Sequence, residues 1–303
     1  MGNVGQVHSS RGLRHGDGLV STAKASGQKT RAMSPRTFIP RLSTIALMTL
    51  LYLATEAKAV TVAVVASRDT TLYQTDDGSL CNGAGIYLFA GRTGQLESES
   101  RRRALLYFNL AGRVPPGSTI ESATLKLYMS RTPSASELVA VHRVDADWGE
   151  GASDAPDEEG GGTACATGDA SWLHTFFNTD LWSTPGGDFA ATASALLGVV
   201  GIGSYTWPST SAMIDDVQSW VDNPDLNFGW ILVGFEGAAL TAKRFDSREN
   251  AIAANRPVLT VKFTPPNIPT ASDIWLAVLA VAISITGAML AKTRSLDGKA
   301  SKS

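Results

Sequence analysis

Residues 101–129 read RRRALLYFNLAGRVPPGSTIESATLKLYM, and apolar residues recur at every second position towards both ends of this stretch. Two sets of apolar residues each fall on one face of an extended chain: Ala104, Leu106, Phe108 and Leu110, then Ala123, Leu125, Leu127 and Met129. A period of two is typical of half-buried antiparallel strands. Between the two sets, VPPGS at 114–118 marks a turn. The stretch therefore predicts two antiparallel strands joined by a Pro/Gly loop.

The same alternation returns in PVLTVKF at 257–263. Shorter apolar segments with strand character are VTVAVVAS at 60–67, IYLFAG at 86–91, ELVAVHRV at 137–144 and GWILVGFE at 229–236. Many short strands with Gly- and Pro-rich connections favour a sandwich or a jelly roll. We therefore expect an all-β fold, an antiparallel β-sandwich or jelly roll, over residues 60–264.

One helix is expected within this β body. The segment SAMIDDVQSWVDNP at 211–224 places Met213, Val217, Trp220 and Val221 at helical spacing on one face. A hydroxyl residue just before this segment could cap its start, and the Asn-Pro pair ends it. We expect the helix to cover one open end of the sandwich.

Residues 36–59 have the three parts of a secretory signal peptide, with basic residues before a short apolar stretch at 45–53. Residues 57–59, Ala-Lys-Ala, fit the small-x-small cleavage pattern, which predicts cleavage between Ala59 and Val60. The alternative is an uncleaved membrane anchor, although the apolar stretch is short for a bilayer.

Another apolar run occupies residues 274–291, which would span about 27 Å as a helix. It follows a Pro-rich hinge at 265–273 and precedes a basic tail at 292–303. Positive charge favours the cytoplasmic side of a membrane. We predict a transmembrane helix with the β body outside the cell, the alternative being a buried core helix.

Between these ends, residues 60–264 suit one domain with a sizeable core. Residues 1–35 are expected to be a disordered or mis-started extension. The net charge of −2 gives no sign of a nucleic-acid partner. The two cysteines, Cys81 and Cys165, both lie in the part predicted to be exported, where an even pair could form one disulfide.

Several blocks resemble the DNRLRE-domain family of bacterial exported proteins, in order over roughly 62–264. They are RRRALLYFNLAGRVPPGSTIESATLKLYM, VHRVDADWGEG, DASWLHTFFNTDLWSTPGGDF, NFGWILVG and KRFDSREN with RPVLTVKF. The nearest match to the string that names the family is Asp246-Ser247-Arg248-Glu249. The resemblance implies a jelly roll related to carbohydrate-binding modules, some of which bind alginate.

The segment IPTASDIW resembles the IPTL-CTERM sorting signal, a short motif followed by an apolar span and a basic end. Ile268, Pro269 and Thr270 match it, while Ala271 stands where Leu is usual. This resemblance implies that export and sorting machinery are partners of the chain. Together with the predicted signal peptide, it places the protein at the cell envelope or extracellular surface, held by a membrane at least transiently.

Five residues are candidates for binding a polysaccharide, with an acidic one as the narrower hypothesis: Arg103, Lys126, Tyr107, Tyr128 and Arg248. The first four should face outward if their strands pack as predicted, and a cationic, aromatic sheet face suits an anionic sugar chain. Arg248 could bind a sugar carboxylate through its guanidinium fork. The alternatives are an ordinary solvated face and, for Arg248, a structural ion pair.

The segment 146–190 is Gly-rich, acidic and aperiodic, as a long functional or mobile loop would be. At its start, Asp145, Asp147 and Glu150 are the best candidates for a Ca²⁺ site, because calcium takes oxygen ligands. The alternative is a solvated acidic loop. Four tryptophans in loop-like segments could stack on sugars or pack under the loops: Trp148, Trp172, Trp182 and Trp207.

Catalytic motifs are missing from the sequence, which has no HExxH pattern, GxSxG elbow or P-loop. We therefore expect a non-catalytic module displayed at the cell surface that binds polysaccharide. The second hypothesis is a structural or adhesive surface or matrix protein. A polysaccharide-active enzyme ranks third.

Overall fold

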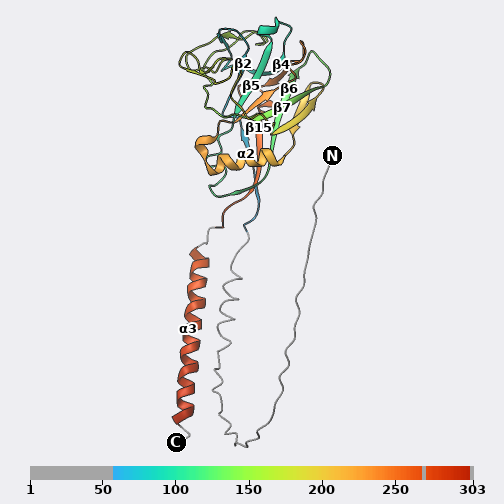
Figure 1. Cartoon of the computed structure of the whole chain (residues 1–303). Coiled ribbons are helices and arrows are strands. Elements are labelled where there is room, and N and C mark those ends of the chain that lie inside the picture. The colour runs from blue at the N-terminus through green and yellow to red at the C-terminus, as the bar shows by residue number, and fades with distance from the viewer. Residues whose placement is uncertain (1–56, 268–270, 301–303) are drawn as a thin grey trace, which may run out of the picture.

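The computed structural model describes residues 57–267 and 271–300, and its body is an antiparallel sheet of eleven strands (Figure 1). One half of the sheet runs in the order β1 (Val60–Val65), β15 (Val258–Thr264), β6 (Thr119–Arg131), β14 (Lys243–Asp246) and β4 (Tyr87–Arg92). In the other half, the order is β5 (Arg101–Tyr107), β13 (Trp230–Val233), β7 (Glu137–Arg143) and β11 (Ala195–Val199). Two further strands pair at the side, β12 (Gly203–Trp207) with β6 and β2 (Arg68–Tyr73) with β5.

Strand β4 joins the two halves, because its residues 87–90 pair with β14 and its last two residues, Gly91 and Arg92, pair with β5. The sheet curls so that both halves contribute to a single apolar core. Trp207 on β12 links them directly, since its indole N–H donates to the Val139 carbonyl on β7 at 2.9 Å. An all-β body built from antiparallel strands is therefore confirmed.

The alternation in residues 101–129 is confirmed as an inside–outside pattern. All eight apolar residues predicted to share faces are buried in the core: Ala104, Leu106, Phe108, Leu110, Ala123, Leu125, Leu127 and Met129. Leu259, Val261 and Phe263 on β15 join them. Because side chains alternate across a strand, the intervening residues face away from this core.

Helix α2 (Ser211–Asp222) lies across one end of the β body, as Figure 1 shows. Thr210 caps it, because its hydroxyl accepts a hydrogen bond from the Met213 N–H at 3.0 Å. The side chains predicted for its apolar face, Met213, Val217, Trp220 and Val221, are buried in the core. The predicted covering helix is confirmed.

Short elements complete the body. Two small antiparallel pairs are β3 (Leu80–Cys81) with β8 (Thr163–Ala164) and β9 (His174–Phe176) with β10 (Asp180–Leu181). Three short 3₁₀ helices are η1 (Glu97–Glu99), η2 (Pro224–Leu226) and η3 (Ala253–Asn255). Strand β1 begins at Val60, the residue predicted to follow signal cleavage, and it pairs with β15.

Helix α3 (Ala271–Ala300) covers the segment 274–291 for which the sequence predicts a membrane span. Across the described part of the chain, no helix is both long enough and apolar enough to cross a membrane. The helix is thus present, whereas the span is not confirmed. Most of the predicted signal peptide and the motif Ile268-Pro269-Thr270 lie outside the described residues.

Candidate functional site

The long acidic segment 146–190 packs on the outer face of the β2–β5–β13–β7 layer. Trp148, Trp172 and Trp182 are at most 6% exposed and form a second apolar cluster there. In the sheet, the cluster includes Leu72, Leu105 and Ile231. The fourth loop tryptophan, Trp207, belongs to the main core instead. Three of the rings are buried under the long segment and Trp207 is buried in the main core, so none of the four offers a free face to a sugar.

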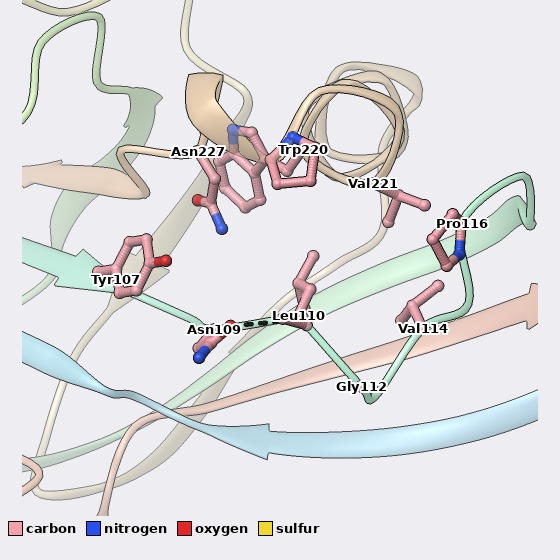
Figure 2. A pocket seen from close by; sticks show the side chains of 11 residues that line it. Tyr107, Asn109, Leu110, Gly112, Val114, Pro116, Trp220, Val221 and Asn227 are labelled. Atoms are coloured by element: carbon pink, nitrogen blue, oxygen red, sulfur yellow. Dashed lines mark hydrogen bonds between the residues drawn. The ribbon is translucent and has the colours of Figure 1, made fainter.

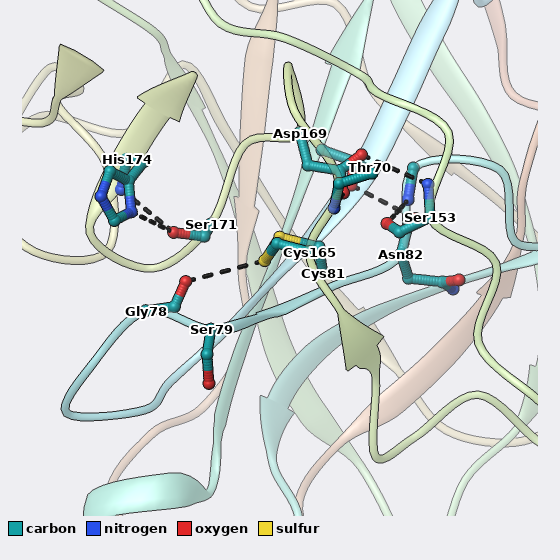
Figure 3. The surroundings of a disulfide bond; sticks show 12 residues. Thr70, Gly78, Ser79, Cys81, Asn82, Ser153, Cys165, Asp169, Ser171 and His174 are labelled. Atoms are coloured by element: carbon teal, nitrogen blue, oxygen red, sulfur yellow. Dashed lines mark hydrogen bonds between the residues drawn. A yellow bond between two sulfur atoms is a disulfide. The ribbon is translucent and has the colours of Figure 1, made fainter. Parts of the chain in front are cut away.

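A disulfide between Cys81 and Cys165 ties the long segment to the chain before β4, with the two Cα atoms 4.9 Å apart (Figure 3). It joins β3 to β8 across a sequence separation of 84 residues. The cysteines and Asp169 form one of the two groups with metal-ligand spacing among the described residues. Because both sulfur atoms are bonded to each other, this group does not offer thiolate ligands to a metal.

Glu159 fastens the same segment from within. Its carboxylate accepts hydrogen bonds from the Asn82 amide and from the backbone N–H groups of Ile86 and Tyr87, at 2.8 to 2.9 Å. Its carbonyl accepts from the Tyr73 hydroxyl at 2.8 Å. Burial raises the pKa of the Glu159 carboxyl, and these hydrogen bonds oppose that rise.

Arg248 lies in the centre of three carboxylates. Its guanidinium donates to both oxygens of Glu150, at 2.6 and 2.8 Å, and lies 2.7 Å from Glu249. The backbone N–H of Arg248 donates to Asp69 at 2.8 Å. Burial, reinforced by the charge of Glu249, raises the pKa of Asp69 well above its usual value. The geometry therefore shows Arg248 in a structural ion pair rather than as a free guanidinium that faces a ligand.

Asp69, Glu150 and Glu249 also form the second group with metal-ligand spacing in the described chain. Two oxygens of this group already accept hydrogen bonds from a guanidinium, and the Asp69 N–H donates to Glu150 at 2.7 Å. A cation would have to compete with Arg248 for the Glu150 oxygens, although Glu249 Oε2 has no hydrogen-bond partner among the described residues. The group is therefore better described as an ion-pair cluster than as an open metal cage.

The three predicted calcium ligands are not brought together. Asp145 pairs with Arg143 at 3.2 Å, Asp147 with Arg68 at 3.2 Å, and Glu150 with Arg248. The sequence showed the clustered acidic residues, but it did not show that arginines distant in the chain would be the partners of Asp147 and Glu150. The predicted grouping is corrected to three separate ion pairs.

The predicted ligand face is also divided. Arg103 and Tyr107 lie on β5, whereas Lys126 and Tyr128 lie on β6, in opposite halves of the curled sheet. The alternation predicted which side of each strand faces outward, but it carried no information on which strands are neighbours. The four residues therefore do not form one surface.

Three of these residues are also engaged within the protein. Arg103 donates to both oxygens of Glu236, at 2.8 and 2.9 Å, and its guanidinium lies over the Trp172 ring. The Arg68 guanidinium lies 4.4 Å from the centre of the Tyr107 ring. Lys126 donates to the Ala254 carbonyl at 3.1 Å. Sequence patterns did not identify Glu236 as the partner of Arg103, nor Asp69 and Glu249 as partners of Arg248.

The start of β5 has a distinctive charge arrangement. Arg102 is buried and donates to three backbone carbonyls and to Gln95, and burial lowers its pKa to about 10. Arg101 and Arg103 flank it and share the single carboxylate of Glu236. The run of three arginines was visible in the sequence, but its shared acidic partner was not.

A recess of about 190 Å³ lies between α2, η2 and the turn after β5, as Figure 2 shows. Its lining is largely apolar, with Leu110, Val114, Trp220 and Val221 among the side chains, and no lining residue is charged. This recess could hold a small apolar group, and none of its lining side chains carries a charge.

No family model matches the chain, and a search of curated proteins found no significant match. The resemblance to the DNRLRE-domain family and to the IPTL-CTERM tail therefore stays a prediction from the quoted residues.

Proposed function

We propose that the protein is a non-catalytic module of the cell envelope that binds polysaccharide through a rigid, curled antiparallel sheet of the jelly-roll type. The sequence blocks that resemble the DNRLRE-domain family support this assignment, since that family is related to carbohydrate-binding modules. Calcium is not part of the proposal, because arginines hold the three candidate carboxylates in separate pairs.

The observation that carries the proposal is that the carboxylates of the acidic segment 146–190 hold this segment against the β body. Its carboxylates fasten it to the sheet through Asp147 to Arg68 and Glu158 to Arg244, and to the turn after β14 through Glu150 to Arg248. Catalysis by a carboxylate pair needs two groups facing a shared substrate position. Carboxylates that hold the fold together instead favour a body that binds without bond-making.

Export of the body is part of the proposal and is supported by the disulfide between Cys81 and Cys165. Disulfides persist in oxidising compartments and are rare in the cytosol. The predicted signal peptide gives the same location from an independent feature of the sequence.

A glycan array probed with the full chain in detergent tests this function. The proposal expects retention on at least one class of polysaccharide, with no release of reducing ends or unsaturated products from it. Lack of retention on both neutral and acidic glycans would contradict the binding function, and turnover of a retained glycan would contradict the non-catalytic assignment.

A second candidate function, assembly into a surface or matrix layer, is favoured by one region. Residues 189–214 contain no charged side chain, and they include β11 at the end of the strand order. Leu196 on β11, Leu138 on β7 and, just beyond β11, Val200 and Ile202 are all more than half exposed. Uncharged edge strands favour pairing between chains. Concentration-dependent oligomers in light scattering, without glycan affinity, would favour this function.

A further inference from the structure

Strand β11 lies at the end of the strand order and uses only one of its two edges. Its five residues pair with β7 in continuous register, from Ala195 opposite Val141 to Val199 opposite Glu137. Within the described part of the chain, no strand pairs with its other edge. The backbone N–H and C=O groups along that edge are therefore open to a further strand.

This edge lacks the devices by which proteins usually prevent pairing with another chain. Natural edge strands carry lysines, prolines or bulges. The sequence of β11, ALLGV, has neither charge nor proline, and its pairing with β7 has no register shift. At the opposite end of the strand order, Lys58 precedes β1, and Lys262 lies opposite Thr61 on the neighbouring strand. Of the two ends, β11 is the unprotected one.

Fixed apolar surface flanks the open edge. Four apolar side chains on or beside β11 are more than half exposed: Leu138, Leu196, Val200 and Ile202. The Tyr205 hydroxyl holds the turn after β11, because it accepts hydrogen bonds from the N–H groups of Val200 and Gly201 at 3.0 Å and donates to the Gly201 carbonyl at 2.7 Å. The exposed apolar residues of this turn are therefore held in place beside the edge.

Gly198 in the middle of β11 is not required by the fold of the chain itself. Its φ lies outside the left-handed region, and a methyl group at this position would meet only the Ser136 hydroxyl within 4 Å, at 3.8 Å. Glycine inside a strand weakens it and often marks the close approach of another backbone. Gly198 and Leu196 are both exposed and share the outward face of the strand. A large side chain and an open position thus lie two residues apart.

We propose that β11 pairs antiparallel with β11 of a second copy of the chain, with Leu197 on the two-fold axis. In this register, Leu196 of each copy lies opposite Gly198 of the other, so a large side chain meets an open position twice. A two-fold axis also brings each charge near its own copy, and residues 189–214 contain no charge to repel. These two features fit a copy of the same strand in particular, because binding a strand of a different protein requires neither.

This inference rests on the second candidate function, assembly, and assigns it a strand, a register and a partner. It does not depend on polysaccharide binding, so the two can be tested separately.

Cysteine cross-linking of the full chain in detergent tests the register. Directly opposite residues of an antiparallel pair have Cβ atoms about 4.5–5.5 Å apart, whereas diagonal neighbours are about 7–8 Å apart. A mixture of Leu196→Cys and Gly198→Cys should therefore form a disulfide-linked dimer under mild oxidation, and either variant alone should form much less. A mixture of Leu226→Cys and Gly198→Cys is the control, since Leu226 is similarly exposed but lies on η2.

Light scattering of the full chain in detergent tests the interface. The protein mass of wild type should rise from one copy to two with concentration. Leu196→Lys should raise the dimer dissociation constant at least about fivefold, because the change is present twice in each dimer and a lysine protects an edge strand. Leu226→Lys adds the same charge outside the edge and should stay within about twofold of wild type.

The outcomes separate this inference from the function on which it rests. Dimers that form equally well in Leu196→Lys, or a cross-link between positions 196 and 198 no stronger than the control, would overturn the β11 interface and leave assembly standing. Growth beyond two copies would overturn the closed two-fold pairing. A mass of one copy at every concentration would overturn assembly as well. Circular dichroism melting like that of wild type shows that each variant is folded.

Discussion

Glu150 accepts two hydrogen bonds from the Arg248 guanidinium, at 2.6 and 2.8 Å, although 98 residues separate the two in the chain. This pair joins the start of the long acidic segment to the turn after β14. Because Asp69 and Glu249 lie beside it, Arg248 is the common cation of three carboxylates.

Substituting Arg248 should therefore cost more stability than substituting Glu150. We expect Arg248→Gln to lower the free energy of unfolding by about 2–3 kcal/mol, because it leaves three neighbouring carboxylates without a cation. Glu150→Gln should cost about 1–2 kcal/mol, since Arg248 keeps Glu249. Urea unfolding followed by tryptophan fluorescence measures both.

The control for this comparison is Arg131→Gln, which removes an ion pair with Glu158 whose side chains are 61% and 64% exposed. Exposed pairs contribute little, so the loss should stay below about 0.5 kcal/mol. Equal losses for Arg131→Gln and Arg248→Gln would show that the cluster around Arg248 contributes no more to the free energy of unfolding than an exposed ion pair does.

Asp69 should make stability fall as the pH rises. Burial raises its pKa in the folded state, so between the ordinary carboxyl pKa and this raised value the folded protein binds more protons than the unfolded chain. Stability from this group is full at low pH and is lost as pH rises through the folded pKa. The Asn side chain of Asp69→Asn cannot ionise, so this variant lacks that loss. The unfolding free energy of the variant minus that of wild type should therefore increase between pH 4 and pH 7. Parallel curves for the two proteins would contradict the assignment.

The disulfide should contribute measurably to stability. It closes a loop across 84 residues, and cross-links of this kind stabilise proteins by about 2–4 kcal/mol, mainly by restricting the unfolded chain. We expect the Cys81→Ser, Cys165→Ser double variant to lose that amount in urea unfolding. Dithiothreitol should shift wild type to the same midpoint and leave the double variant unchanged. A shift of the double variant by dithiothreitol would show that the reagent acts elsewhere.

The cap of α2 is a smaller and local contribution. Thr210→Ala removes the hydroxyl that accepts the Met213 N–H, and we expect a loss of about 1 kcal/mol in thermal unfolding. Thr210→Ser keeps a hydroxyl and should remain close to wild type. If the serine variant loses as much as alanine, the methyl group of Thr210 rather than the cap explains the effect.

Local periodicity was enough to predict β5, β6 and α2, because burial of one face repeats every two residues in the strands and near every four in the helix. Strands β2, β11, β12 and β14 lie outside the segments that the sequence predicted as strands. The sequence did not predict strand order, so it placed Arg103 and Lys126 on one surface although they lie in different halves of the sheet. Long-range pairs were equally invisible. Nothing local connects Arg248 to Glu150 or Arg103 to Glu236, and these pairs redefine the candidate sites.

The salt dependence of binding to polygalacturonate tests the central claim most directly. A rigid module that holds an acidic polysaccharide by charge should bind the polymer at low ionic strength and lose affinity several-fold as sodium chloride rises from about 0.05 to 0.3 M, because salt screens exposed charge. Absence of binding at low salt, or an affinity that salt does not change, would contradict the account.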